Sequence, residues 1–177
     1  MVPARPHKDS GLTSVHHRRM SNIGRDTMEI LEGGHDNDIV TTRVLHVQRE
    51  LVFRAWTEPD HLRRWWGPKG FTNTFKEYDL RPGGKWRFVM HGPEGGNYNN
   101  ECTFIRIEPP GFIAWEHVSP PYFHIIVRFD EIAGGSTQLT WTMRFRTTEE
   151  CEKLRSFVTG KNEENLDRLE AELAAIR

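Results

Sequence analysis

Two polar residues, Glu101 and His117, interrupt a series of inward-facing apolar positions, and a carboxylate beside an imidazole can do acid–base or hydrogen-bonding chemistry. Each residue lies in a segment that alternates like a β-strand. Arg106 and Glu116 mark the outward faces of the two segments, so alternation predicts that Glu101 and His117 point inward. The sequence therefore predicts a polar pair on the inner wall of a sheet.

The turn between these two segments sets their register. If they pair about "EPPG", Ile107 lies near Ile113. That register places Thr103 opposite His117, with Glu101 diagonally adjacent. Three interpretations stay open: a structural pair near a wet rim, a polar anchor for an apolar ligand, or an acid–base pair. No nucleophile, metal-ligand trio or phosphate loop accompanies the pair, and a β-bulge in the first segment would turn its carboxylate outward.

Aromatic side chains supply most of the predicted inner wall, because six Trp and ten Phe provide large, flat, rigid surfaces. In "HLRRWWGPKGF", the adjacent Trp65 and Trp66 point about 100° apart on a helix, so one flat face cannot easily hide both. We expect one to pack beneath the short helices and the other to cover a cavity mouth; the alternative is that both are core. The predicted ligand-binding residues are Trp65, Trp66, Trp86, Phe88, Met90, Glu101, Thr103, Trp115, His117, Trp141, Phe157 and Gly160.

The elements that position these residues follow from periodicity and turn chemistry. Alternating apolar residues indicate strands, and apolar residues at i, i+3 and i+4 indicate helices. Consecutive strands with short links predict an antiparallel meander. The predicted elements are a strand at 38–47, a helix at 49–57, a second short helix ending at Trp66, six strands between 71 and 145, and a long helix at 147–176.

Three details of these elements can be predicted more closely. In "RPGG", Pro82 and Gly83 suit a type II turn. Thr147 and Glu150 fit a capping box at the start of the last helix. Gly160 lies inside that helix, so either the helix bends there or something packs close to its backbone.

One long amphipathic helix and one curved sheet each have an apolar face, and each face must be buried against the other. The predicted fold class is therefore α+β: a curved antiparallel sheet with two short helices and a long C-terminal helix enclosing a cavity. Residues 1–36 show no sustained period, which predicts a disordered arm ahead of a domain at 37–177.

Composition limits the classes of protein. The 24 Lys and Arg residues balance 25 Asp and Glu residues, which gives no reason to expect nucleic acid as a partner. No apolar run approaches the roughly 20 residues of a membrane span. Cys102 and Cys151 form no metal-type cluster and suit free thiols in the cytoplasm. We predict a cytoplasmic monomer or homodimer without a cofactor, a metal, a nucleic-acid partner or integral membrane association.

Several longer stretches resemble a known family. "VFRAWTEPDHLRRWWGPKGF", "DLRPGGKWRFVMHGPEGG" and "FIRIEPPGFIAWEH", followed by a closing helix with an internal Gly, look like the domain related to the C-terminal half of the activator of Hsp90 ATPase. The resemblance covers about residues 38–175. It implies the helix-grip fold of the START-like, Bet v 1-like superfamily, with a deep cavity between sheet and helix. Superfamily members bind lipids, sterols, polyketides and hormones, and some are cyclases or hydroxylase components.

Two functions follow as leading expectations. The first is a protein that binds an apolar or aromatic small molecule in the cavity. The second is a protein-interaction module of co-chaperone or stress-response type, which would act on a chaperone or another partner through its outer surface. Known Hsp90 activators have a separate domain ahead of this one, and a 36-residue arm is too short to be that domain. A weaker third expectation is an enzyme of cyclase or hydrolase type.

Overall fold

The structure is a computed structural model that describes residues 27–176. The chain divides after Gly34, and residues 27–31, which precede that point, are helical. All other helices and strands described below belong to the unit that begins at His35. The predicted disorder of the arm at 1–36 falls mainly on residues outside the described range and stays a prediction.

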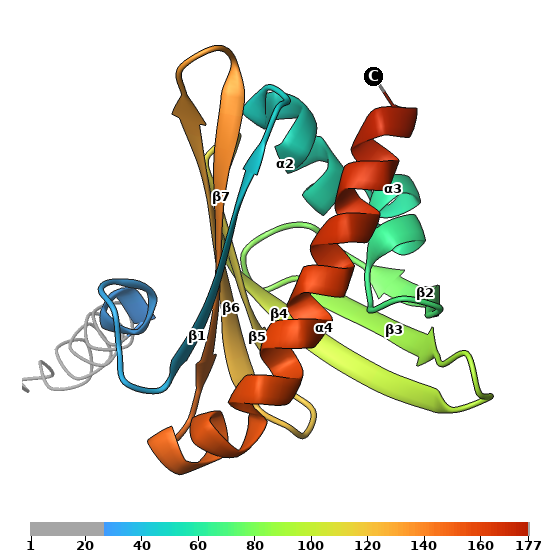
Figure 1. Cartoon of the computed structure of the whole chain (residues 1–177). Helices are drawn as coiled ribbons and strands as arrows, with labels where there is room; N and C mark the ends of the chain where they lie inside the picture. Colours follow the sequence, from blue (N-terminus) through green and yellow to red (C-terminus); the bar gives the residue numbers. More distant parts are fainter. Residues whose placement is uncertain (1–26, 177) are drawn as a thin grey trace, which may run out of the picture. The chain divides into compact units, whose positions relative to one another are not determined.

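A seven-stranded antiparallel sheet forms most of this unit, in the order β1-β7-β6-β5-β4-β3-β2 (Figure 1). The six strands from β2 to β7 form the meander that the short turns predict. β1 pairs with β7, so the strands that come first and last in the sequence are neighbours in the sheet. The strands are β1 (Asp38–Leu45), β2 (Thr72–Tyr78), β3 (Lys85–His91), β4 (Asn97–Glu108), β5 (Phe112–His117), β6 (Phe123–Ile132) and β7 (Ser136–Phe145).

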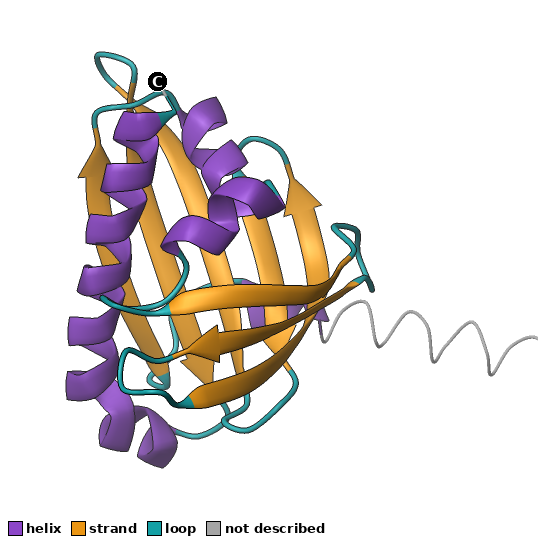
Figure 2. Cartoon of the chain, turned by 90° about the vertical axis from the view of Figure 1, so that its right-hand side faces the viewer, coloured by secondary structure: helices purple, strands orange, loops and turns teal. Residues whose placement is uncertain are grey.

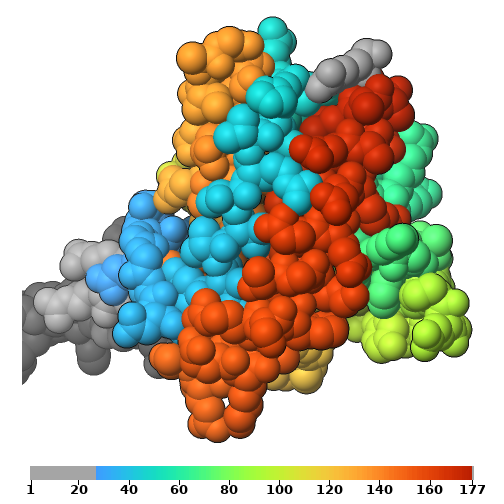
Figure 3. All heavy atoms as spheres, viewed as in Figure 1, coloured from blue at the N-terminus to red at the C-terminus, as the bar shows by residue number. Residues whose placement is uncertain are grey.

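Three helices cover one face of the sheet: α2 (Arg49–Thr57), α3 (Pro59–Trp65) and α4 (Thr148–Ala175). Figure 2 shows α2 and α3 on the same face as α4. In the space-filling view, α4 lies directly beside β1 (Figure 3). Arg43 of β1 joins them by ion pairs to Glu163 and Asp167 of α4, at 2.5 and 2.7 Å. The predicted fold class, a curved sheet gripped by a C-terminal helix, is confirmed.

The "RPGG" turn and a bulge in β4 form one structural unit. Gly84 N donates to Arg81 O at 2.8 Å, and Gly83 has φ +81°, as a type II turn requires at its third position. Gly83 N also donates to Phe104 O, and Phe104 N donates to Gly84 O, at 2.8 and 3.0 Å. Just beyond Phe104 the β4–β5 register shifts by one residue. The turn is therefore hydrogen-bonded to β4 at the point where the ladder becomes irregular.

α4 buries one stripe of side chains against the sheet, and Leu166 and Leu169 at its centre are fully buried. One half of the predicted capping box is confirmed, because the Thr147 side chain accepts a hydrogen bond from Glu150 N. The structure contradicts the predicted placement of Phe157 and Gly160 beside the cavity, and of the two alternatives for Gly160 it excludes close packing against the backbone. Phe157 is 65% exposed, because it lies about 100° around the helix from Val158, which packs on the core. Gly160 is exposed, and a Cβ added there would have no neighbouring atom within 4 Å, so nothing packs closely against it.

We expect Leu166→Ala and Leu169→Ala each to lower the free energy of unfolding by about 2–5 kcal/mol, because each removes a fully buried aliphatic side chain. Chemical denaturation measures this. Lys153→Ala is the control, since Lys153 is exposed and pairs only with Glu149 on the helix surface; it should change stability by less than about 0.5 kcal/mol. Unchanged midpoints for both leucine variants would contradict the packing of α4 on the sheet.

Candidate functional site

A cavity of about 130 Å³ lies between the sheet, α4 and the turn that follows α3. Its wall is mostly aromatic, aliphatic and sulfur-containing. Among the described residues that line it, none is Lys, Arg, Asp or Glu. The lining residues are Trp66, Gly67, Pro68, Phe88, Met90, Asn100, Cys102, Trp115, His117, Phe123, Ile125, Trp141, Met143, Asn162 and Asn165.

The structure brings six of the predicted ligand-binding residues together around this cavity. These are Trp66, Phe88, Met90, Trp115, His117 and Trp141. Trp65 lies behind the wall, where its indole N–H donates to Ala55 O at 2.8 Å and its ring is buried beneath the short helices. Trp86 is also fully buried, and stacks on Phe88 with ring centroids 4.3 Å apart. The adjacent tryptophans thus differ in position: Trp65 is core, and Trp66 lines the cavity.

The inward facing predicted for Glu101 and Thr103 is wrong. Glu101 lies on the outer face of β4, 3.6 Å from both Lys85 and Arg87, and Lys85 Nζ donates to Thr103 Oγ1 at 2.8 Å. The cause is the bulge after Phe104, which adds one residue to β4 and so reverses the facing of every residue before it. Phe157 and Gly160 are also absent from the lining, because both are exposed on α4.

Because of the bulge, Cys102 rather than Thr103 is the register partner of His117. Asn100, two residues before Cys102, also points inward and takes the place predicted for Glu101. His117 Nε2 is 2.9 Å from Asn100 Oδ1, and Nδ1 is 2.8 Å from Pro121 O. The imidazole stacks on Phe123 with ring centroids 4.6 Å apart. The polar pair of the cavity is therefore an imidazole and an amide, without a carboxylate.

Burial lowers the pKa of His117, although the carbonyl groups of Pro121 and Ser119 oppose this shift. A neutral imidazole has one N–H, so it can donate to only one of two acceptors, Pro121 O or Asn100 Oδ1. A protonated ring could donate to both. The surroundings of His117 therefore disfavour its positive charge through burial, yet they also contain two acceptors that a protonated ring could use.

Cys102, His117 and Asn100 are the residue types of a cysteine hydrolase, but they are not arranged as one. A catalytic imidazole must be free to accept the thiol proton. Here both ring nitrogens of His117 already lie within hydrogen-bonding distance of Pro121 O and Asn100 Oδ1. Burial also raises the pKa of the Cys102 thiol well above its ordinary value, with a smaller contribution from Glu101. The thiol is therefore protonated and acts as part of an apolar wall.

Two residues of α4 fix the turn Trp66-Gly67-Pro68, which forms one wall of the cavity. Asn165 Oδ1 accepts from Gly67 N at 2.6 Å. The Arg168 guanidinium donates to Gly67 O at 2.7 Å and to Pro68 O at 3.0 Å. Gly67 has φ +99°, a backbone conformation that strains residues with a side chain, so glycine is favoured at this position. These bonds hold Trp66 and α4 together as one part of the wall.

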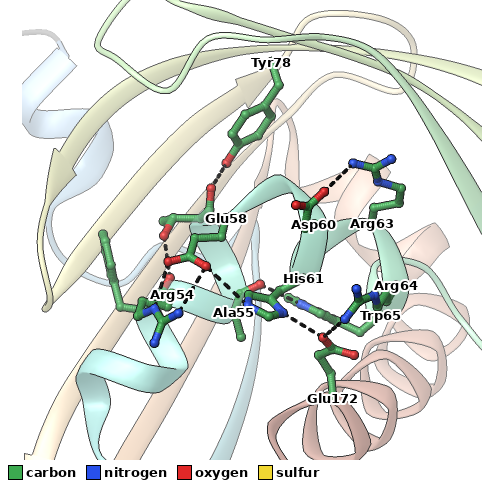
Figure 4. A network of polar contacts seen from close by, with 12 residues as sticks. Arg54, Ala55, Glu58, Asp60, His61, Arg63, Arg64, Trp65, Tyr78 and Glu172 are labelled. Atoms are coloured by element: carbon green, nitrogen blue, oxygen red, sulfur yellow. Dashed lines mark hydrogen bonds and ion pairs between the residues drawn. The ribbon is translucent and has the colours of Figure 1, made fainter. Parts of the chain in front are cut away.

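A second polar network holds α3 against α4 at the same end of the sheet (Figure 4). Glu172 of α4 is largely buried, and its Oε1 lies 2.8 Å from His61 Nδ1 and 3.2 Å from Arg64 Nη1. His61 Nε2 is 3.3 Å from Glu58, which also pairs with Arg54 of α2. The network joins all three helices, and so fixes the position from which Trp66 enters the cavity.

Four polar or thiol residues of the lining were not predicted from the sequence: Asn100, Cys102, Asn162 and Asn165. Strand alternation gave the wrong facing for Asn100 and Cys102, because it does not reveal the bulge in β4. A signal for the other two exists, because Asn162 and Asn165 continue the buried stripe of Leu166 and Leu169 at spacings of three and four residues. An amide on an apolar helix face is a candidate for a buried polar contact.

The part of the chain that the structure describes contains neither a metal-ligand cluster nor a membrane-crossing helix. Residues 27–176 contain no group of three or more His, Cys, Asp or Glu side chains placed to hold a metal ion. Within the same residues, no helix combines the length and hydropathy needed to cross a bilayer.

Comparison with known families gives one match, to the family described as "Activator of Hsp90 ATPase homolog 1-like protein", over residues 46–174. The chain belongs to this family. The match covers most of the chain and includes every residue that lines the cavity. The resemblance seen in the "WWGP" and "RPGG" segments is confirmed. A search of curated proteins returned no match.

Solved structures show the same fold. A crystal structure of a Nitrosomonas europaea protein has a TM-score of 0.74 at 23% identity, and the alignment covers 82% of this chain and 99% of the other. A Rhodobacter sphaeroides protein gives 0.73 at 24% identity, covering 82% and 98%. A solution structure from Arthrobacter aurescens gives 0.73 at 21% identity, covering 82% and 92%. These identities establish the fold alone.

The facing of β4 can be tested with two adjacent residues. Asn100→Ala should lower the free energy of unfolding by about 0.5–1.5 kcal/mol, because it removes a partner of the buried His117. Glu101→Ala should cost less than about 1 kcal/mol, since its ion pairs with Lys85 and Arg87 are long and lie at the surface. Urea denaturation compares the two variants. A larger loss for Glu101→Ala would mean that β4 has the opposite facing.

The pH dependence of stability provides a second test. The folded-state pKa of His117 is below the ordinary value of 6.5, so the unfolded chain binds more protons than the folded chain near that pH. The stabilisation from the neutral ring is complete above about pH 6.5 and is lost as the pH falls toward the folded-state pKa. Burial also lowers the pKa of His124, which acts in the same direction. We expect the melting temperature to decrease between pH 7.5 and 5, and less steeply for His117→Gln.

The control for this measurement is His91→Gln, because His91 is half-buried at the far end of β3 and contacts Thr74 and Asn97 instead of the cavity. It should reproduce the slope of the natural protein. An identical slope for His117→Gln and the natural protein would contradict the burial of a neutral His117.

Proposed function

We propose that this protein binds a small, largely apolar molecule in the cavity between the sheet and α4. The observation that carries the proposal is the composition of the wall: flat aromatic surfaces and sulfur atoms, interrupted only by a few amide and imidazole groups. Ligand sites in proteins typically combine a mainly apolar wall with a few placed polar groups. Apolar burial would supply most of the affinity, and the polar groups would orient the ligand.

The volume limits the size of the ligand. Sites for drug-sized molecules usually measure roughly 300–1,000 Å³, whereas this cavity measures about 130 Å³. An engineered apolar cavity of roughly 150 Å³ in another protein binds benzene. A ligand with about one aromatic ring therefore fits, and a sterol or a long acyl chain does not fit this conformation. For so few atoms, dissociation constants of about 0.1–1 mM are expected.

Catalysis is less well supported than binding. An acid–base pair would need the carboxylate of Glu101, which lies on the outer face of β4. A thiol nucleophile would need a base, and both ring nitrogens of His117 lie beside acceptors instead. For the interaction-module alternative, the large exposed apolar side chains of the cavity-bearing unit include Val40 and Val44 on one face of β1. Tyr98 and Phe157 lie on other elements, β4 and α4.

The unpaired thiols of the two cysteines support an inference about the cellular compartment. Cys102 and Cys151 are both buried free thiols. We infer a reducing setting such as the cytoplasm, where thiols remain unpaired.

The proposed function can be tested with one substitution at two buried cysteines. Cys102→Leu adds bulk inside the cavity, so it should abolish toluene binding while leaving stability unchanged or improved. Cys151→Leu adds the same bulk where the side chain is fully buried outside the cavity. It should cost about 1–3 kcal/mol of stability and leave toluene binding intact. Quenching of the tryptophan fluorescence and the shift of the melting temperature measure binding.

Toluene at ten times its dissociation constant should stabilise the natural protein by about 1.4 kcal/mol. No quenching and no stabilisation in the natural protein would contradict the proposed function. Equal toluene binding by Cys102→Leu would place the site elsewhere. If toluene binds as expected, native mass spectrometry of the protein purified from its own source can identify the natural ligand from the mass of a retained small molecule.

A further inference from the structure

The cavity wall contains one buried hydrogen-bond acceptor that the protein leaves unused. Asn162 lies on α4, lines the cavity and is 3% exposed. Its amide nitrogen donates to Thr41 Oγ1 at 3.1 Å and approaches Met143 Sδ at 3.5 Å. A thioether sulfur can only accept a hydrogen bond, so this contact favours the orientation in which the amide nitrogen faces Met143. Both N–H bonds of Asn162 therefore have partners.

The carbonyl oxygen of Asn162 has no donor among the residues that the structure describes. Unlike the indole N–H groups of the core, this oxygen is not completely sealed by neighbouring atoms, and the residue that carries it lines the cavity. A buried amide oxygen without a donor is costly, and such groups are normally satisfied. The wall thus presents an acceptor that a bound molecule could satisfy.

The other amide groups of the wall are already engaged. Asn165 Oδ1 accepts from Gly67 N, and its Nδ2 donates to Lys161 O. Asn100 Oδ1 lies against His117, and its Nδ2 donates to Tyr98 O. Asn100 Oδ1 thus has the His117 ring nitrogen within 2.9 Å, whereas the carbonyl oxygen of Asn162 makes no hydrogen bond to any described residue.

Charge gives the second constraint on the ligand. The lining residues include no Lys, Arg, Asp or Glu, so an ionic group would enter this wall without a counter-ion. Removing an ion from water without a partner is strongly unfavourable. A carboxylate or an ammonium group is therefore a poor ligand for this cavity, and a neutral polar group is a good one.

We propose that the ligand is an uncharged, single-ring aromatic molecule that carries a hydrogen-bond donor, such as a phenol or an N–H heteroaromatic, and that this donor binds Asn162 Oδ1. This inference rests on the proposed function and specifies the chemical class of its ligand. The aromatic ring lies among Trp66, Trp115 and Trp141, and the thioethers of Met90 and Met143 make favourable contacts with its edge.

Four probes of similar size separate the alternatives at pH 7: phenol as a neutral donor, toluene as its isostere without a donor, pyridine as an acceptor, and benzoate as an anion. Titrations with the full chain, followed by tryptophan fluorescence and confirmed by calorimetry, give the dissociation constants. We expect phenol to bind about 3- to 10-fold more tightly than toluene, as one additional neutral hydrogen bond allows. Pyridine should bind no better than toluene, and benzoate should bind much more weakly than phenol.

Asn162→Leu removes the acceptor and keeps an apolar side chain of similar size. The phenol preference over toluene should disappear in this variant, while toluene binding stays equal or improves. Met90→Leu is the matched control, because it alters the same wall without removing a hydrogen-bonding amide, and the preference should persist. Asn162→Met is a second variant for the case that Asn162→Leu does not fold, since its flexible side chain repacks more readily.

The outcomes distinguish this inference from the proposed function. If toluene binds the natural protein and phenol binds no better, the inference is overturned and the proposed function stands. Tightest binding of pyridine or benzoate overturns the inference in the same way. A phenol preference that survives in the folded Asn162 variants assigns the donor to another group and also overturns it. If none of the probes binds, the proposed function itself fails.

Discussion

The contacts of Trp66 are the interaction on which the rest of this structure depends. Its ring lies 5.5–5.8 Å, centroid to centroid, from each of the other five tryptophans. These come from α2, α3, β3, β5 and β7, so one side chain contacts both short helices and the middle of the sheet. Aromatic pairs of this kind contribute roughly 0.5–1.5 kcal/mol beyond their buried area. The cavity exists beside this cluster because rigid rings cannot collapse to fill it.

Many of these rings meet edge to face, which explains a second feature of the core. The indole N–H groups of Trp56, Trp86, Trp115 and Trp141 are buried without a hydrogen-bond partner among the described residues. In a T-shaped contact, the positive edge of one ring faces the negative face of another, as in Trp56 against Trp141 at 83°. Such N–H groups can interact weakly with ring faces. The cluster is thus held by ring geometry rather than by conventional hydrogen bonds.

One face of α4 carries both core residues and residues that line the cavity. Leu166 and Leu169 bury apolar area against the sheet, whereas Asn162 and Asn165 on the same face line the cavity. Asn165, with Arg168, fixes the turn that positions Trp66. A change in the position of α4 would therefore change both the core and the cavity wall, which couples the shape of the cavity to the stability of the fold.

The sequence by itself determined the order of the elements, the antiparallel meander, the α+β class and the family, because strand alternation, helical periodicity and turn residues are local signals. It also placed six wall residues correctly, among them Trp66 and His117. Only the tertiary structure decided the facing of Glu101, because strand alternation does not reveal the bulge in β4, which lies beside the hydrogen bonds between Phe104 and the "RPGG" turn. It likewise decided that β1 pairs with β7 and that Asn162 faces the cavity, since both depend on contacts about a hundred residues apart in the sequence.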